Sequence, residues 1–167
     1  VISGMGITPE RTKSVTFVGP YMMSGKSILV GAAAQAKVKT GADFNKPDIT
    51  LLALENSTSE TFVKRKLPDA KLKTIATYEE GVQMVISGKA DAMVADMPAC
   101  KLSILRNPNS GLAVIEPPLS VEPVGIAITM NDAQFENLVR NYLTTFEKIG
   151  LTTQLRQQWF ENSAWIV

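Results

Sequence analysis

The sequence predicts an α/β protein in which short strands alternate with helices around a parallel sheet. Between residues 49 and 115, each short apolar run is followed by a helical pattern that begins at a capping residue or a proline. Strand and helix units of this length connect parallel strands through right-handed crossovers. The segments on either side of this region do not complete a domain between them. We therefore expect two lobes joined by two chain crossings, which is typical of a hinge.

Three strand and helix cycles make up the central region. Ser57 precedes Glu60 by three residues, which is the capping-box spacing of a helix start. Thr77 and Glu80 repeat that spacing for the second helix. In the third cycle the strand ends at Asp96, and a helix follows it. The predicted strands are residues 49–54, 72–76, 90–95 and 112–115.

The flanking segments predict further elements. A helix start is expected at Thr8 and Pro9, and strands are expected at residues 27–33 and 124–129. A helix ending near Gly150 and a shorter helix follow. The first of these carries an apolar face at three- and four-residue spacing, formed by Phe135, Leu138, Val139, Tyr142, Leu143 and Phe146. We assign residues 1–31 to part of lobe one, 32–119 to lobe two, a parallel α/β domain, and 120–167 to the return to lobe one.

Composition narrows the function classes. The 167 residues are 45% hydrophobic and 20% charged, and the net charge is only +1. A balanced charge of this kind does not provide the basic field that nucleic-acid binding requires. Apolar runs such as Ile28–Ala34 are far shorter than the roughly 20 residues that span a bilayer, so we expect no membrane insertion in this segment.

The residue inventory argues against many enzymes. The chain contains no histidine, which removes the commonest general base and the commonest zinc ligand. Its single cysteine, Cys100, lacks a second thiol or a histidine to activate it, so we interpret it as a small buried residue. We accordingly expect no catalytic residue, no metal and no cofactor. Because the chain starts at Val1 inside an apolar pattern and without a leader, we also expect it to be a fragment.

Three motifs, in this order, resemble family 3 of the bacterial extracellular solute-binding proteins, which includes periplasmic amino-acid-binding proteins. They are Ile2–Arg11 with Val15–Phe17 and Pro20-Tyr21, then Asn56-Ser57-Thr58, and finally Gly88–Asp96. The similarity covers essentially the whole chain. It implies a periplasmic-binding-protein-like fold with two lobes, of which lobe one is incomplete, because family members begin with further residues that build most of that lobe.

The resemblance also implies a ligand site. Arg11, together with backbone N–H groups near Gly6 and Thr58, corresponds to the groups that bind the ligand's α-carboxylate. A guanidinium matches a carboxylate in geometry, and a helix N-terminus adds unpaired donors. Asp96 and the carbonyl of Gly4 correspond to the groups that hold the α-ammonium. The candidate ligand-binding residues are Gly4, Gly6, Arg11, Ser57, Thr58 and Asp96. The family usually carries a serine or threonine at the position of Gly6.

These residues also have structural interpretations. An arginine in a first helical turn is commonly solvated. Ser57 and Thr58 would serve as a helix cap without any ligand, and Asp96 would cap the helix that Pro98 begins. Their joint placement at the ends of strands favours a binding site, because ligands of α/β sheets bind beyond the carboxyl ends of the strands.

The resemblance implies a protein that captures a small amino acid or related carboxylate in the periplasm and delivers it to the permease of an ABC-type importer. Two alternatives stay open. The first is periplasmic cyclohexadienyl dehydratase, to which Ser57–Leu67 and Ala70-Lys71 are similar, although Ala99 stands where such enzymes carry the proposed acidic glutamate. The second is the ligand-sensing module of a membrane receptor, which reuses the same lobes.

Overall fold

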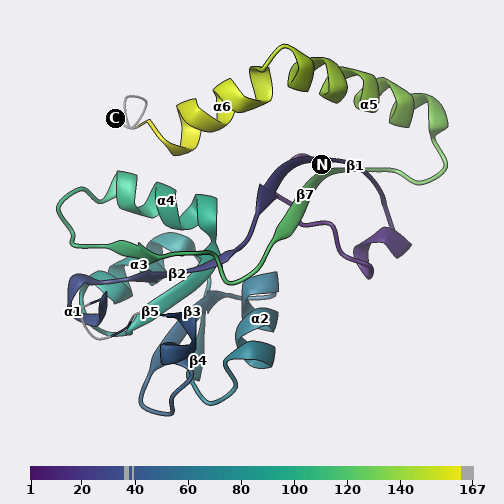
Figure 1. Ribbon diagram of the computed structural model, residues 1–167. Coiled ribbons are helices and arrows are strands. Elements are labelled where there is room, and N and C mark those ends of the chain that lie inside the picture. The colour runs from purple at the N-terminus through teal and green to yellow at the C-terminus, as the bar shows by residue number, and fades with distance from the viewer. Residues whose placement is uncertain (36–37, 39, 163–167) are drawn as a thin grey trace. The chain divides into compact units, whose positions relative to one another are not determined.

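The computed structural model describes residues 1–35, 38 and 40–162 of the chain (Figure 1). The chain divides into two compact units. Unit 2 is the continuous segment Gly25–Ser120, whereas unit 1 combines residues 1–24 with residues 121–162. The chain thus passes between the units twice, after Ser24 and after Ser120. Unit 2 starts at Gly25, and not at residue 32 as in our division, because the strand that follows Gly25 pairs within its sheet.

Unit 2 contains a five-stranded sheet with the order β4-β3-β5-β2-β6. Its strands are β2 (Lys26–Val30), β3 (Thr50–Leu54), β4 (Lys71–Ile75), β5 (Ala92–Asp96) and β6 (Ala113–Ile115). Strand β3 pairs in parallel with β4 and β5, as the strand and helix cycles predict. Strand β2, however, runs antiparallel to both β5 and β6, so the expectation of a wholly parallel sheet is wrong. Only β3, β4 and β5 are joined by the crossover helices that return the chain to the same end of the sheet, which parallel pairing requires.

Helices cover both faces of this sheet, and Figure 1 shows α2 on one side and α3 with α4 on the other. The elements are α1 (Ala32–Gln35), η2 (Gly41–Phe44), α2 (Thr58–Lys66), α3 (Tyr78–Ile86) and α4 (Met97–Arg106). Alternate residues of the central strands enter two separate cores. Ile28 and Val94 pack with Val63 of α2, whereas Leu29 and Met93 pack on the opposite face. Because both faces are covered, β2 is buried along its whole length.

Two of the helices in unit 2 start as the sequence predicts. The hydroxyl of Ser57 accepts a hydrogen bond from the backbone N–H of Glu60 at 3.2 Å, and Thr77 does the same for Glu80 at 3.2 Å. Each glutamate in turn accepts a backbone N–H from the residue before its cap, at 2.7 Å from Asn56 in the first case. Both capping predictions are therefore confirmed, and they satisfy donors that a helix start leaves without intrahelical partners.

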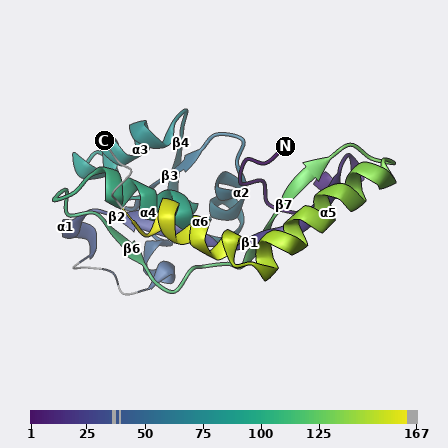
Figure 2. The same ribbon diagram turned by 90° about the horizontal axis from the view of Figure 1, so that it is seen from above.

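Unit 1 is built on a two-stranded antiparallel sheet of β1 (Thr16–Ser24) and β7 (Glu122–Ile128). The sequence patterns did not predict β1, and the helix expected at Thr8 is only the three-residue 3₁₀ helix η1 (Arg11–Lys13). Helices α5 (Ala133–Lys148) and α6 (Leu151–Phe160) follow β7, as expected. Gly150, with a φ of 77°, separates the two helices, which run one after the other in Figure 2.

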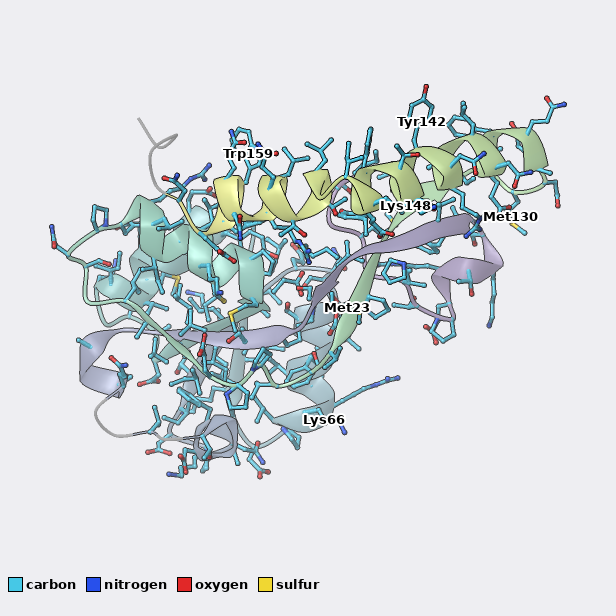
Figure 3. The ribbon with its side chains drawn as sticks, turned by 45° about the horizontal axis from the view of Figure 1, so that its top comes forward. Met23, Lys66, Met130, Tyr142, Lys148 and Trp159 are labelled. Atoms are coloured by element: carbon cyan, nitrogen blue, oxygen red, sulfur yellow. The ribbon has the colours of Figure 1, made fainter. Side chains whose placement is uncertain are left out.

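The apolar face of α5 is largely exposed among the described residues. Helix α5 packs against β1, yet Phe135, Leu138 and Tyr142 keep 45%, 51% and 58% of their surface accessible. Figure 3 shows Tyr142 of α5 and Trp159 of α6 pointing away from strands β1 and β7. The face that the sequence pattern predicts is thus present on the helix, and the described part of the chain covers it only partly. No helix in that part is long and apolar enough to cross a membrane.

Two methionines test how much the unit 2 core contributes to stability. Met93 is fully buried, whereas Met23 is 54% exposed. We expect Met93→Ala to lower the free energy of unfolding by about 2–5 kcal/mol, because it leaves a cavity in the core. The matched Met23→Ala variant should change it by less than about 0.5 kcal/mol. Urea denaturation followed by circular dichroism measures both, and equal effects would show that the core is not packed as described.

Candidate functional site

In unit 1, Arg11 is held next to Gly6. The guanidinium Nη1 donates a hydrogen bond to the Gly6 carbonyl at 2.9 Å, and the backbone N–H of Arg11 donates to Thr8 Oγ1 at 3.3 Å. Gly6 itself forms a bridge with Val124 of β7, so the arginine is attached to the edge of the unit 1 sheet. A guanidinium has five N–H donors, and the bond to Gly6 uses one of them while it positions the side chain.

Gly6 has room for a side chain. A Cβ atom built there would lie 3.7 Å from Arg11 Nη1 and 3.8 Å from Glu122 Oε2, which is ordinary van der Waals contact. A Cβ atom therefore fits, so the structure does not require a glycine at this position on steric grounds. Gly4, the other glycine of the candidate site, is exposed and donates its N–H to the Tyr21 hydroxyl at 3.2 Å.

In unit 2, a buried lysine connects two of the candidate residues. The ammonium of Lys26 donates to Asp96 Oδ1 and to Thr58 Oγ1, each at 2.6 Å. The Lys26 side chain is 1% exposed, whereas that of Asp96 is 34% exposed. In the register of the sheet, Lys26 of β2 lies directly opposite Asp96 of β5, so the backbone ladder fixes this ion pair. A buried ammonium needs such partners, because an unpaired charge in the interior is very costly.

Asp96 and Ser57 have different roles at their helix starts. Asp96 occupies the N-cap position of α4 with an extended backbone, but its side chain makes no capping hydrogen bond. The interpretation of Asp96 as a helix cap is therefore wrong, because its carboxylate turns to Lys26 instead. The Ser57 hydroxyl, in contrast, accepts from Glu60 N–H and donates to the Leu54 carbonyl at 2.6 Å. Its hydroxyl is thus engaged at the start of α2.

The structure joins four of the six candidate residues, two in each unit, whereas Gly4 bonds to Tyr21 and Ser57 caps α2. Arg11 and Gly6 are in contact in unit 1, and Thr58 and Asp96 are joined through Lys26 in unit 2. Sequence reasoning missed Lys26. The signal in the sequence was a lysine placed directly before the apolar run Ser27–Val30. In a strand that is buried on both faces, water does not solvate the lysine ammonium, so the ammonium needs partners within the protein.

Cys100 and Tyr78 lie close enough to Asp96 for its charge to affect them. Burial, followed by the negative charge of Asp96, raises the pKa of the Cys100 thiol to about 12. The same two causes, in the same order, raise the pKa of the Tyr78 hydroxyl to about 12. Cys100, which lies on α4, is fully buried in the core on this face of the sheet, as its interpretation as a structural residue requires. Both groups are therefore protonated and neutral at pH 7.

We predict that native Cys100 resists alkylation. With a pKa of about 12 the thiolate fraction at pH 8 is about one in ten thousand, and burial blocks the reagent as well. Because Cys100 is the only cysteine, iodoacetamide labelling followed by mass spectrometry measures this residue alone. The native protein should remain unlabelled, while protein unfolded in urea should react fully. Rapid labelling of the folded protein would contradict the burial of this thiol.

The fold defines a class of protein. A continuous α/β unit connected by two crossings to a second unit is the architecture of two-lobed solute-binding proteins. Residues 1–162 match the family described as bacterial extracellular solute-binding proteins, family 3. The chain belongs to this family, which confirms the resemblance carried by the three motifs.

Named relatives agree with this assignment. The chain is 27% identical to ABC transporter arginine-binding protein 1 of Escherichia coli, over 96% of this chain and 65% of the relative. It is 26% identical to cyclohexadienyl dehydratase of Pseudomonas aeruginosa, over 96% of this chain and 59% of the enzyme. Among solved structures, a binding component of an ABC transporter from Wolinella succinogenes, complexed with lysine, is 35% identical with a TM-score of 0.92. That match covers 99% of this chain and 71% of the other.

The chain is shorter than these relatives. It spans 57–65% of the first three curated proteins that it matches. The ligand and the partner of the whole protein are therefore matters for proposal.

Proposed function

We propose that this protein binds a small α-amino acid or a closely related carboxylate for uptake into the cell, and that it catalyses no reaction. The observation that carries this proposal is the position of Arg11, whose guanidinium is fixed at Gly6 by a 2.9 Å hydrogen bond. A pre-positioned guanidinium is suited to a carboxylate, which it binds through two parallel N–H bonds. Relatives named for binding arginine, glutamine and cystine support this class of ligand.

Each unit would contribute groups to the ligand. Arg11 of unit 1 would bind the carboxylate, assisted by the backbone N–H groups at the start of α2, around Thr58. Asp96, together with Gly4 and Gly6, would bind the group on the neighbouring α-carbon.

The partner follows from the family. We infer that the loaded protein delivers its ligand to the permease of an ABC importer, which places it outside the cytoplasm. The relatives named as ABC transporter binding proteins support this inference.

The dehydratase among the relatives calls for a comparison of the chemistry. A dehydratase must protonate a leaving hydroxyl, and this needs a placed acid. Ala99, in the first turn of α4, stands where the resemblance places that acid, and it lies in a groove with Tyr78. The pKa of about 12 at Tyr78 makes it a weak proton donor at neutral pH. These residues favour binding over catalysis.

We predict that Arg11→Ala abolishes binding of the ligand. In a thermal-shift screen of the common amino acids and their carboxylate analogues, a ligand at 100 times its Kd should stabilise the fold by about 2.7 kcal/mol. Arg11→Ala should lose this stabilisation, because the carboxylate loses its charged partner. The control is Arg65→Ala, which removes an exposed guanidinium from α2 and should leave the shift unchanged. A ligand-induced shift that survives in Arg11→Ala would rule out the carboxylate assignment.

We also predict no dehydratase activity. Protein incubated with prephenate or with arogenate should release no phenylpyruvate or phenylalanine above the uncatalysed rate, because the proton donor is absent at Ala99. Chromatography of the products over several hours measures this. Product formed at a rate proportional to protein concentration would assign the chain to the enzyme class instead.

A further inference from the structure

A guanidinium and a carboxylate flank the open side of Gly6 in unit 1. The position that a Cβ atom would take at Gly6 lies 3.7 Å from Arg11 Nη1, 3.8 Å from Glu122 Oε2 and 4.0 Å from the carbonyl oxygen of Pro123. Apart from Gly6 and its chain neighbours, these are the three nearest heavy atoms, and all of them are polar. The direction in which a side chain would leave Gly6 therefore points toward one cationic donor and two acceptors.

The backbone of unit 1 holds the two acceptors next to Gly6. Glu122 is the first residue of β7, and Val124 of the same strand forms a bridge with Gly6. Between them, the Pro123 carbonyl accepts the N–H of Ile7 at 2.8 Å. All of these residues belong to unit 1, so the arrangement is a property of that unit alone.

Arg11 and Glu122 do not form an ion pair with each other. In the described part of the chain, the Arg11 guanidinium pairs with no carboxylate, and its hydrogen bond goes to the Gly6 carbonyl at 2.9 Å. Both side chains are half-buried, so a ligand can reach them. A carboxylate has about four lone-pair sites, and Glu122 can accept N–H groups of a ligand in addition to bonds within the protein.

These groups are complementary to the two charged groups of an α-amino acid. Its carboxylate and its ammonium are attached to the same carbon, so they lie side by side with opposite charges. The guanidinium of Arg11 matches the first, and the carboxylate of Glu122 matches the second. The Pro123 carbonyl has a second lone pair for another N–H of the ammonium. Gly6 has no side chain that would stand between these groups and a ligand.

We propose that Glu122 is a specificity-determining residue whose carboxylate binds the α-ammonium group of the ligand, while Arg11 binds the carboxylate. The inference rests on the proposed function, to which it adds a second acid besides Asp96. Glu122 also supplies a polar partner at the position where the family usually carries the hydroxyl of a serine or threonine. Unit 1 by itself then distinguishes an amino acid from the same carboxylate without its ammonium.

Pairs of probes that differ only in the α-ammonium test this proposal by isothermal titration calorimetry on the whole chain. The pairs are leucine with isocaproate, glutamine with glutaramate, and lysine with ε-aminocaproate. In each pair whose side chain is accepted, we expect the amino acid to bind more tightly by about tenfold or more, because a hydrogen-bonded charge pair is lost with the ammonium. Equal affinities overturn the inference and leave the proposed function intact. Binding of no probe, with no hit in the amino-acid screen, overturns both.

The variant Glu122→Gln assigns the preference to this residue. It keeps the shape of the side chain and removes its charge, so we expect the amino acid to bind more weakly by about tenfold or more. The matching carboxylate without an ammonium should change by less than about threefold, because it makes no use of Glu122. A merely structural role of Glu122 would weaken both members of a pair equally. Equal weakening, or an unchanged preference, overturns the inference.

The control is Glu147→Gln, which removes an exposed carboxylate from α5 and should leave both affinities within about twofold. If Glu122→Gln does not fold, Glu122→Asp replaces it. This variant keeps the charge but withdraws it from Gly6 by one methylene group. We then expect the preference for the amino acid to fall by about threefold or more. An unchanged preference in folded Glu122→Asp contradicts the role assigned to Glu122.

Discussion

A buried lysine ammonium needs polar partners, and in unit 2 this requirement brings together the starts of helices α2 and α4. Lys26 is the first residue of β2, and its ammonium bonds to a hydroxyl at the start of α2 and to a carboxylate at the start of α4. The Lys26 side chain therefore connects strand β2 to the starts of both α2 and α4. The contact compensates the buried charge of Lys26 and fixes the side chains of Thr58 and Asp96 at these two helix starts.

Much of the fold was predictable because its signals are local. Hydrophobic periodicity and capping residues identified the strands and helices from β3 through β6, and α5 and α6 as well. Strand β1 escaped prediction because Gly19-Pro20 interrupts it with a pattern that is typical of turns. The direction of β2 also escaped, because an apolar run carries no information about whether its neighbours run parallel or antiparallel to it.

The candidate site also contains one contact that is local in the sequence and one that is not. The contact of Arg11 with Gly6 spans five residues, and a motif could represent it. The partnership of Lys26 with Asp96 joins residues 70 positions apart, and it follows only from the pairing of β2 with β5. A lysine is ordinarily a surface residue, so nothing in its own type suggested an interior role. The sequence motifs therefore identified Asp96 as a candidate residue, but they could not show that Lys26 is its partner.

The two crossings have a topological consequence. Ser24 at the end of β1 pairs with Glu122 at the start of β7, so the strands of unit 1 meet as the arms of a hairpin. Unit 2 replaces the turn of that hairpin, and its own ends are tied together by Lys26 N–H to Ser120 Oγ at 2.9 Å and Leu119 N–H to the Lys26 carbonyl at 2.7 Å. The segment 25–120 is thus a self-contained unit whose first and last residues lie next to each other. Recombination at these two ends would exchange the unit for the equivalent unit of a relative without cutting a strand of the recipient.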